Sequence, residues 1–388
     1  MFDIIDEWGP EKIVGVSDSR TRMRGVLVID NTARGMGKGG TRISPTVSVT
    51  EVARLARNMT WKWAGVDLFY GGAKAGIQAD PAAAPKEDVL RAFVRALRNE
   101  VPEEYVFGLD VGLTEADAAI MLDETGGRGG AVGTPHALGG LPYDQLGVTG
   151  YGVAETVDAA AQFTGLSTSS LTASIQGFGA VGAATARRLD ELGVTIVAVS
   201  TSQGGLHNPD GLNVSQLLEL RAAYSDALVN CYADAKPLTA GEELTVPADV
   251  LIPAALQDVI DAELARILPA RILVEGANLP SSPEAQQILH DRGVIVVPDF
   301  IANAGGVVAA AVAMDSRYSA IRPEPAAVFD SISTKLRAST LEILDGSKQQ
   351  RLTTHHVARA TAQARVAEAM RLRGRLPNAH QESRGVRK

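Results

Sequence analysis

Apolar residues in the first 150 positions recur at intervals of three and four, the spacing of one face of an α-helix. Three such helices are predicted. The first follows a capping-box pair, Ser48 and Glu51, and carries the stripe Val52, Leu55, Met59 and Lys62. The second begins at Pro85 and carries Val89, Leu90, Phe93 and Leu97, and the third begins at Thr114 and Asp117. Short apolar runs alternate with these helices, so we expect an N-terminal α/β domain.

From Thr149 onward the pattern changes to short apolar runs, each followed by Gly, Pro, Ser or Asn. The runs are 171–176, 194–201, 250–252, 272–274 and 294–297. Such runs are typical of strands covered by helices on both faces, and they predict a Rossmann-like, doubly wound sheet. From about Ala326 the composition is helical, and we expect the basic tail Arg371–Lys388 to be solvated.

Composition limits the class of protein. The chain has 388 residues, of which 45% are apolar and 21% charged, which fits two globular domains. A net charge of -8 argues against nucleic-acid binding, and no apolar run approaches the ~20 residues of a membrane span. Met1–Glu7 does not read as a signal peptide, and Cys231 is the only cysteine, so we expect a cytoplasmic protein. The six histidines are scattered, and no metal site is expected.

A glycine fingerprint follows the run 171–176 and opens a helix. It comprises Gly177, Phe178, Gly179, Ala180, Val181 and Gly182. The first glycine permits a tight turn, the second lets a pyrophosphate approach, and the third lets helix and strand pack closely. The N–H groups at the helix start attract the anion. This context predicts a dinucleotide site.

The end of the next predicted strand bears on the choice of cofactor. An NAD site usually has an acid there to hold the ribose 2′-hydroxyl, whereas this chain has Ser200 and Thr201. Hydroxyls can donate to a 2′-phosphate that a carboxylate would repel. The cofactor is therefore NADP or NAD, with NADP slightly favoured.

Three lysines in the first domain occupy unusual places. Lys62 shares a helix face with apolar residues and is expected on the buried side, where an ammonium needs an anion. Lys38 and Lys74 lie in glycine-rich turns that can close around a small ligand. Clustered cations and desolvation lower a lysine pKa, so such a lysine can act as a base. Asp110, between glycines, is a candidate proton acceptor.

These residues resemble the glutamate, leucine, phenylalanine and valine dehydrogenase superfamily over about Gly35 to Asp315. The motifs are Lys38–Arg42 with Pro45, Met59–Lys62, Gly71–Lys74, Gly108–Asp110, Thr149–Val153, Gln176–Gly182, Gly276–Asn278 and Pro298–Gly306. The resemblance implies a substrate domain (1–148), a nucleotide domain (149–325), a cleft between them where reaction occurs, and C-terminal helices (326–388) that return to the first domain. It also implies an enzyme that interconverts an L-amino acid with a 2-oxo acid and ammonia, in a homo-oligomer.

The resemblance also implies residue roles. Lys62 would bind the substrate α-carboxylate, Lys74 would activate water and polarise the reacting carbon, and Asp110 would carry protons to and from the amine. The residues that would place the nicotinamide are Thr149, Asn278 and Asn303.

Substrate choice depends on a second set of positions. Glutamate-specific members carry lysine at Lys38, which favours glutamate. They also carry a hydroxyl where this chain has Ala310 and an arginine where it has Gln145, and Ala75 stands where the family usually has glycine. The alternatives are a dehydrogenase for a neutral or unusual amino acid and, more remotely, a non-catalytic sensor of nucleotides or amino acids.

Overall fold

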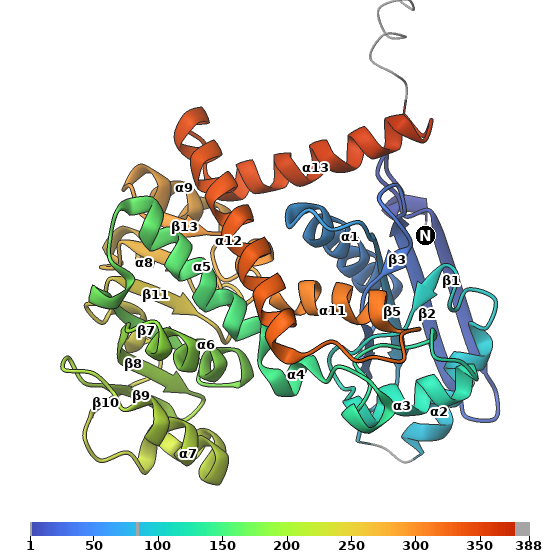
Figure 1. The fold of residues 1–388 in the computed structure, drawn as a ribbon, viewed down its shortest axis with the longest axis horizontal. Coiled ribbons are helices and arrows are strands. Elements are labelled where there is room, and N and C mark those ends of the chain that lie inside the picture. The colour runs from blue at the N-terminus through green and yellow to red at the C-terminus, as the bar shows by residue number, and fades with distance from the viewer. Residues whose placement is uncertain (1, 83–84, 377–388) are drawn as a thin grey trace, which may run out of the picture. The chain divides into compact units, whose positions relative to one another are not determined.

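The computed structural model describes residues 2–82 and 85–376, which form two compact units (Figure 1). The first unit contains the chain up to Tyr143, the segment Ala310–Glu324 and the residues from Ala360 onward. The second contains Asp144–Ala309 and Pro325–Arg359. The chain therefore crosses from one unit to the other four times. Three crossings lie within the helices α4 (Tyr143–Leu146), α11 (Gly305–Ser316) and α13 (Thr354–Leu372), and the fourth lies between Glu324 and Pro325.

The first unit is built on a mixed sheet in the order β1-β2-β5-β3-β6, with β4 also paired to β5. The strands are β1 (Lys12–Asp18), β2 (Met23–Asn31), β3 (Gly37–Lys38), β4 (Thr41–Ser44), β5 (Gly71–Gln78) and β6 (Tyr105–Val106). β2 runs antiparallel to β5, whereas β3 and β4 both run parallel to it. Every residue of β5 except the last is buried, so this strand is the centre of the unit.

Three helices cover this sheet, as the sequence predicted, and they are α1 (Val49–Gly65), α2 (Lys86–Ala96) and α3 (Glu115–Thr125). α1 packs closely on β5 because Gly72 has no side chain. A Cβ at Gly72 would lie 2.0 Å from Oγ1 of Thr60. On the other face, a cluster that includes Leu27, Phe93 and Phe107 is fully or almost fully buried.

The two predicted capping boxes differ. At α3 the box is complete, since the Thr114 backbone N–H donates to the Asp117 carboxylate at 2.7 Å. At α1 the Ser48 hydroxyl accepts from the Glu51 N–H at 3.2 Å, but the Glu51 carboxylate accepts from Arg42 instead of closing the box. Glu51 thereby links α1 to β4.

The second unit is built on a sheet in the order β10-β9-β8-β7-β11-β12-β13. The strands are β7 (Thr172–Gln176), β8 (Thr195–Thr201), β9 (Gly204–His207), β10 (Lys236–Leu238), β11 (Val250–Pro253), β12 (Ile272–Val274) and β13 (Ile295–Val297). The five predicted strands are confirmed and run parallel, with β8 on one side of β7 and β11 on the other. The order therefore reverses beside β7, which is where a doubly wound sheet binds its ligand.

Two strands, β9 and β10, were not predicted. They add antiparallel pairs at the β8 edge, β9 to β8 and β10 to β9. Their sequences, Gly-Gly-Leu-His and Lys-Pro-Leu, contain too few apolar residues for a pattern to appear. The α/β fold class is confirmed, with a mixed rather than an all-parallel sheet.

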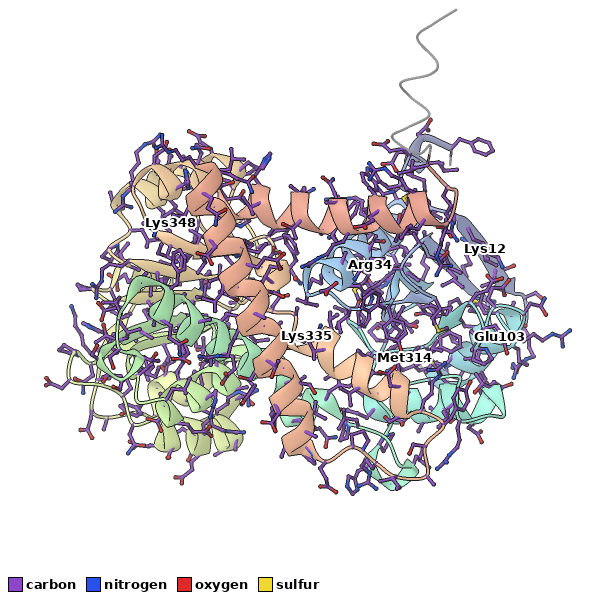
Figure 2. The ribbon with its side chains drawn as sticks, turned by 45° about the horizontal axis from the view of Figure 1, so that its top comes forward. Lys12, Arg34, Glu103, Met314, Lys335 and Lys348 are labelled. Atoms are coloured by element: carbon purple, nitrogen blue, oxygen red, sulfur yellow. The ribbon has the colours of Figure 1, made fainter. Side chains whose placement is uncertain are left out.

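The helices of the second unit are α5 (Val148–Thr164), α6 (Ala180–Glu191), α7 (Val214–Tyr224), α8 (Ala262–Ile267), α9 (Pro283–Asp291), α10 (Asp299–Ala302) and α12 (Pro325–Gln350). α12 lies along α5, where the buried Glu155 accepts from Ser333 Oγ at 2.6 Å and pairs with Arg337. Near the end of α12, the Lys348 ammonium lies 5.8 Å from the Phe163 ring centre (Figure 2). α12 therefore groups with the second unit.

The short segment Ala310–Glu324 lies, in sequence, between the two parts of the second unit. It includes the second half of α11, and it groups with the first unit, where Met314 is completely buried (Figure 2). Among the described residues, the structure has no helix with the length and apolar character to cross a bilayer. Within the same residues, no group of three His, Cys, Asp or Glu side chains is placed to hold a metal ion.

Candidate active site and nucleotide loop

Lys74 and Asp110 form a close ion pair in the first unit. Lys74 lies in the middle of β5 and is 6% exposed, and its Nζ is 3.2 Å from Oδ2 of Asp110. Asp110 follows β6 in a segment fixed by Thr41, whose N–H donates to the Gly108 carbonyl at 2.8 Å. The two residues proposed for catalysis are therefore brought together by the middle of β5 and the segment that follows β6, which both pair with β4.

The surroundings of this pair shift the pKa values of both members downward. Burial lowers the pKa of Lys74, and the Arg42 charge adds to this effect, while Asp110 opposes it. Burial alone would raise the pKa of Asp110, but Lys74 and Arg42 outweigh burial and hold that pKa below its ordinary value. Loss of a proton from Lys74 near neutral pH would make its amine a base.

Lys38 is also buried, but its ammonium already has partners. It is 2% exposed, and Nζ donates to the carbonyls of Val106 at 2.8 Å, Phe107 at 3.2 Å and Gly39 at 3.4 Å. These carbonyls occupy all three donors of an ammonium. Burial, with the charges of Lys74 and Arg317, lowers the pKa of Lys38 to about 7. The Lys38 ammonium therefore has protein partners whether or not a substrate supplies a side-chain carboxylate.

Lys62 lies on α1, next to a residue that contacts Lys38 of β3. Its neighbour Trp63 donates from Nε1 to the Lys38 carbonyl at 3.0 Å. The prediction that Lys62 is buried is wrong, because its side chain is half-buried. Of the predicted stripe, only Val52 is buried. The buried face of α1 turns instead through Ala56, Thr60 and Trp63.

The other substrate positions offer no polar partner of the expected kind. Ala310, on α11, is 9% exposed, and Gln145, on α4, is exposed. Ala75 is completely buried in β5, opposite Leu27 of β2, so its methyl group is part of the core.

Sequence reasoning assigned no role to Arg42, although the structure places it at the pair. Arg42 Nε donates to Asp110 Oδ2 at 2.9 Å, and its NH1 donates to Glu51 Oε1 at 2.7 Å. The residue follows Lys38 in the same motif, so the motif itself was the available signal.

The glycine loop of the second unit has the geometry that the fingerprint predicts. Gly177 has φ 87°, and a Cβ at Gly182 would lie 1.9 Å from the Gly177 carbonyl oxygen. A Cβ at Gly179 would have no neighbour within 4 Å, so the space before α6 is open. The N–H groups of Ala180, Val181 and Gly182 lie in the first turn of α6, where no helical acceptor exists. This cradle fits the pyrophosphate of a dinucleotide.

The hydroxyls at the end of β8 have other partners, contrary to expectation. Ser200 is buried, and its Oγ accepts from the Gly177 N–H at 3.1 Å and donates to Glu243 Oε1 at 3.0 Å. Thr201 Oγ1 donates to the Asp226 carbonyl at 2.8 Å. Each hydroxyl has one proton, so neither is arranged to donate to a 2′-phosphate.

Charged residues from later segments reach this edge instead, and sequence reasoning missed them. Arg221, on α7, donates from Nε to the Phe178 carbonyl in the glycine loop at 3.0 Å. The Asp226 carboxylate accepts from Ser202 Oγ at 2.5 Å, just beyond β8. Both lie about twenty or more residues from β8 in sequence, where no spacing rule finds them.

The residues predicted for the nicotinamide half gather at the carboxyl ends of the strands. Asn303 is buried, and its Nδ2 donates to Asn278 Oδ1 at 3.0 Å. Thr149 lies near the start of α5, and a Cβ at Gly306 would lie 3.2 Å from its Oγ1. Chain segments far apart in sequence thus converge here.

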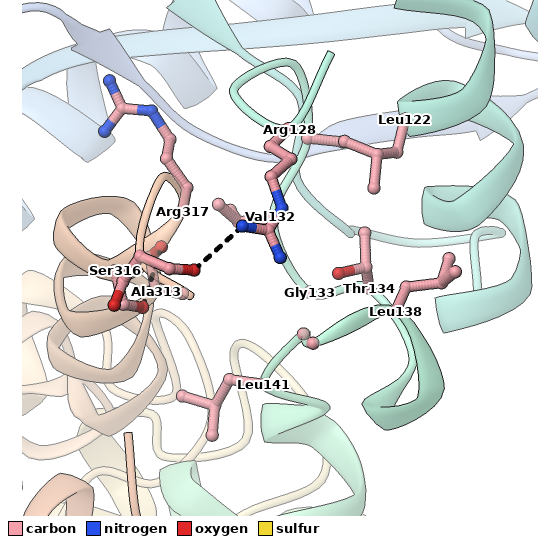
Figure 3. A pocket seen from close by; sticks show the side chains of 14 residues that line it. Leu122, Arg128, Val132, Gly133, Thr134, Leu138, Leu141, Ala313, Ser316 and Arg317 are labelled. Carbon is pink, nitrogen blue, oxygen red and sulfur yellow. Dashed lines mark hydrogen bonds between the residues drawn. The ribbon is translucent and has the colours of Figure 1, made fainter. Parts of the chain in front are cut away.

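A small cavity elsewhere in the first unit is not the substrate site. It measures about 40 Å³ and is lined by residues that include Arg128, Thr134, Leu141 and Arg317 (Figure 3). Arg128 crosses it and donates to the Ser319 carbonyl at 3.2 Å. The volume suits a few water molecules rather than an amino acid, and none of the predicted site residues lines it.

The family models match nearly the whole chain. Residues 11–127 match the Glu/Leu/Phe/Val dehydrogenase dimerisation domain, and residues 139–374 match the Glutamate/Leucine/Phenylalanine/Valine dehydrogenase family. The chain belongs to this dehydrogenase family. It is an NAD(P)-dependent amino acid dehydrogenase of the glutamate dehydrogenase type.

Curated relatives and a solved structure place it more closely within the family. The chain is 38% identical to the NADP-specific glutamate dehydrogenase of Saccharolobus shibatae, over 89% of this chain and 84% of the relative. It is 33% identical to the NAD-specific glutamate dehydrogenase A of Halobacterium salinarum, over 89% and 81%. The hetero-hexameric glutamate dehydrogenase of Thermus thermophilus has a TM-score of 0.84 at 30% identity, over 97% and 93%.

Proposed function

We propose that Lys74 and Asp110 catalyse the reversible oxidative deamination of an L-amino acid, with L-glutamate as the first candidate. The observation that carries this proposal is the buried pair itself, with 3.2 Å between Nζ and Oδ2. A base and an acid with opposed charges, held this closely in a glycine-rich setting, can move protons to and from one small substrate.

The proton steps follow from the charges. The Asp110 carboxylate accepts a proton from the substrate ammonium, so that the free amine can be oxidised to an imine. The neutral amine of Lys74 then takes a proton from the water that attacks the imine carbon. Collapse of the adduct releases ammonia and the 2-oxo acid. The Gly177–Gly182 loop would hold the pyrophosphate of a bound dinucleotide, whose nicotinamide would supply the acceptor for the hydride of the substrate Cα. Lys62 would bind the α-carboxylate.

Glutamate is placed first because the curated relatives described above are glutamate dehydrogenases. One observation favours a second candidate, an amino acid with a neutral side chain. Lys38 already donates to three carbonyls, Ala310 has no hydroxyl, and Gln145 has no charge. A side-chain carboxylate would have to draw the Lys38 ammonium away from the backbone.

The experiment is reductive amination of a panel of 2-oxo acids with ammonia and NADPH or NADH. We expect turnover, with kcat/KM highest for 2-oxoglutarate. A higher kcat/KM for 4-methyl-2-oxopentanoate or phenylpyruvate would promote the second candidate. Absence of turnover with every 2-oxo acid, in a protein that binds NADPH, would favour a sensor over an enzyme.

For the cofactor, we propose that NADP is accepted, with Arg221 as the cation beside the glycine loop. The Asp226 carboxylate at the end of β8 would keep the preference over NAD small, because it repels a 2′-phosphate.

We also propose a homo-oligomer in which residues 11–127 contribute to the interface, as their match to a dimerisation domain supports. The exposed, unpaired thiol of Cys231 supports a cytoplasmic location.

A further inference from the structure

Arg42 approaches the proposed catalytic pair from the strand next to Lys74. It lies on β4, opposite Gly76 of β5, and alternates with the buried residues Thr41 and Ile43. Its side chain is 23% exposed, and that of Asp110 is 22% exposed. Strand pairing therefore fixes the backbone of Arg42, and half-burial limits the number of positions its guanidinium can take.

Both cations of this cluster contact the same oxygen of Asp110. Arg42 Nε is 2.9 Å from Oδ2, and Lys74 Nζ is 3.2 Å from it. Within the described residues, Oδ1 accepts no hydrogen bond from the protein. Oδ1 is therefore the oxygen left to take a proton from a substrate.

A second carboxylate, that of Glu51, also binds the Arg42 guanidinium. Its NH1 donates to Glu51 Oε1 at 2.7 Å, at the start of α1. A guanidinium cannot lose its proton in a protein, so Arg42 is a permanent charge beside two groups that titrate. It favours the ionised form of Asp110 and the neutral form of Lys74, which are the forms that deamination requires.

We propose that Arg42 is a positioning residue for this reaction, which fixes the Asp110 carboxylate through Oδ2 and keeps Oδ1 as the proton acceptor. The inference rests on the proposed function of Lys74 and Asp110. It adds a residue that acts through Asp110 and needs no contact with substrate.

The other titratable groups around the pair are few. Glu51 of α1 faces Arg42, and Tyr105 of β6 and Lys38 of β3 lie on the sheet side. Burial raises the pKa of Tyr105, and Asp110 adds to this effect, so the phenol stays neutral. Lys38 is a second cation on this side, whose own pKa the Lys74 charge lowers, and it is unchanged in the variants below.

The test is the pH dependence of kcat for oxidative deamination in four variants of the full chain. Arg42→Gln removes the charge, so the pKa values of Asp110 and Lys74 both rise. The acid limb of the profile should move up by about 1 pH unit, with kcat about tenfold lower at a pH on that limb. Arg42→Lys keeps the positive charge, so its acid limb should lie close to that of the wild type. Glu51→Gln removes the opposing charge and should move the limb slightly down.

Arg57→Gln is the matched control. Arg57 is similarly covered, pairs with Asp30 and Asp6, and has no contact with Lys74 or Asp110. It should lower the melting temperature and leave the acid limb in place. A role for Arg42 in stability alone predicts the same result for Arg42→Gln, and that result would overturn the proposal.

The two proposals fail in different ways. If Lys74→Ala and Asp110→Asn keep wild-type turnover, the proposed function is wrong. If both lose turnover while Arg42→Gln keeps the wild-type limb, only the role of Arg42 is wrong. Should Arg42→Gln fail to fold, the pH profiles of Arg42→Lys and Glu51→Gln provide the test. An acid limb that does not move in Glu51→Gln would contradict the coupling between Arg42 and the Lys74–Asp110 pair.

Discussion

At the scale of single residues, partners decide what each buried lysine can do. Lys74 is paired with one carboxylate that can itself accept protons, so its environment suits chemistry. Lys38 is paired with three carbonyls that cannot titrate, so its environment fixes the backbone around β6. The same residue type on two paired strands, β3 and β5, thus has two different consequences.

Lys38 should give the protein a pH-dependent stability that Lys38→Met lacks. Its pKa is about 7 in the folded state and 10.5 ordinarily. Below pH 7 both states hold the proton, and stability does not change with pH through this group. Between pH 7 and pH 10.5, Lys38 holds its proton only in the unfolded state, so the free energy of unfolding of the wild type rises with pH. The rise from pH 7 to 9 should be up to about 2 kcal/mol.

Urea unfolding of the wild type and Lys38→Met at pH 6, 7 and 9 measures this difference. From pH 6 to pH 9, the free energy of unfolding should rise more in the wild type than in Lys38→Met. Parallel pH dependence in the two proteins would show that Lys38 titrates normally, and therefore that it is not held in the buried position described.

At the scale of elements, the end of β8 shows how a site can be completed by distant segments. The 3₁₀ segment Ser225–Asn230 brings Asp226 to Thr201 and Ser202, and α7 brings Arg221 to the glycine loop. The sequence around β8 contains neither charge. The expectation about Ser200 and Thr201 considered only neighbours in sequence, and tertiary packing supplied the missing residues.

Asp226→Asn tests which of these charges governs the cofactor. Loss of the carboxylate should raise kcat/KM for NADPH relative to NADH, by about tenfold if repulsion costs ~1.4 kcal/mol. Asp210→Asn is the control, since it makes the same charge change beyond β9, where a Cβ at Gly211 would lie 2.8 Å from Cγ2 of Thr195, at the other end of β8. An unchanged ratio in Asp226→Asn would place the 2′-phosphate elsewhere.

The elements with strong local patterns were predictable. The three helices of the first unit and the five parallel strands appear where periodicity placed them, because burial of one face or both imposes that pattern. The Lys74–Asp110 pair was also accessible, since each residue belongs to a recognisable motif. Their contact with Arg42 was not, because a hydrogen bond between β4 and the segment after β6 leaves no trace in spacing.

At the scale of the whole molecule, the chain does not divide into consecutive domains. Helices α4, α11 and α13 each pass between the two units, and α12 packs on α5 of the second. The buried Glu155 on α5 pairs with Arg337 from α12 within this packing.

The central claim is that Lys74 performs chemistry in the first unit while the glycine loop of the second unit holds the nucleotide. Steady-state turnover and NADPH affinity of Lys74→Ala, measured on one preparation, test it most directly. We expect kcat to fall by at least 10²-fold, with the Kd for NADPH within about threefold of wild type, because Gly177–Gly182 is unchanged. Retention of more than about a tenth of wild-type kcat, a barrier change below ~1.4 kcal/mol, would contradict the account.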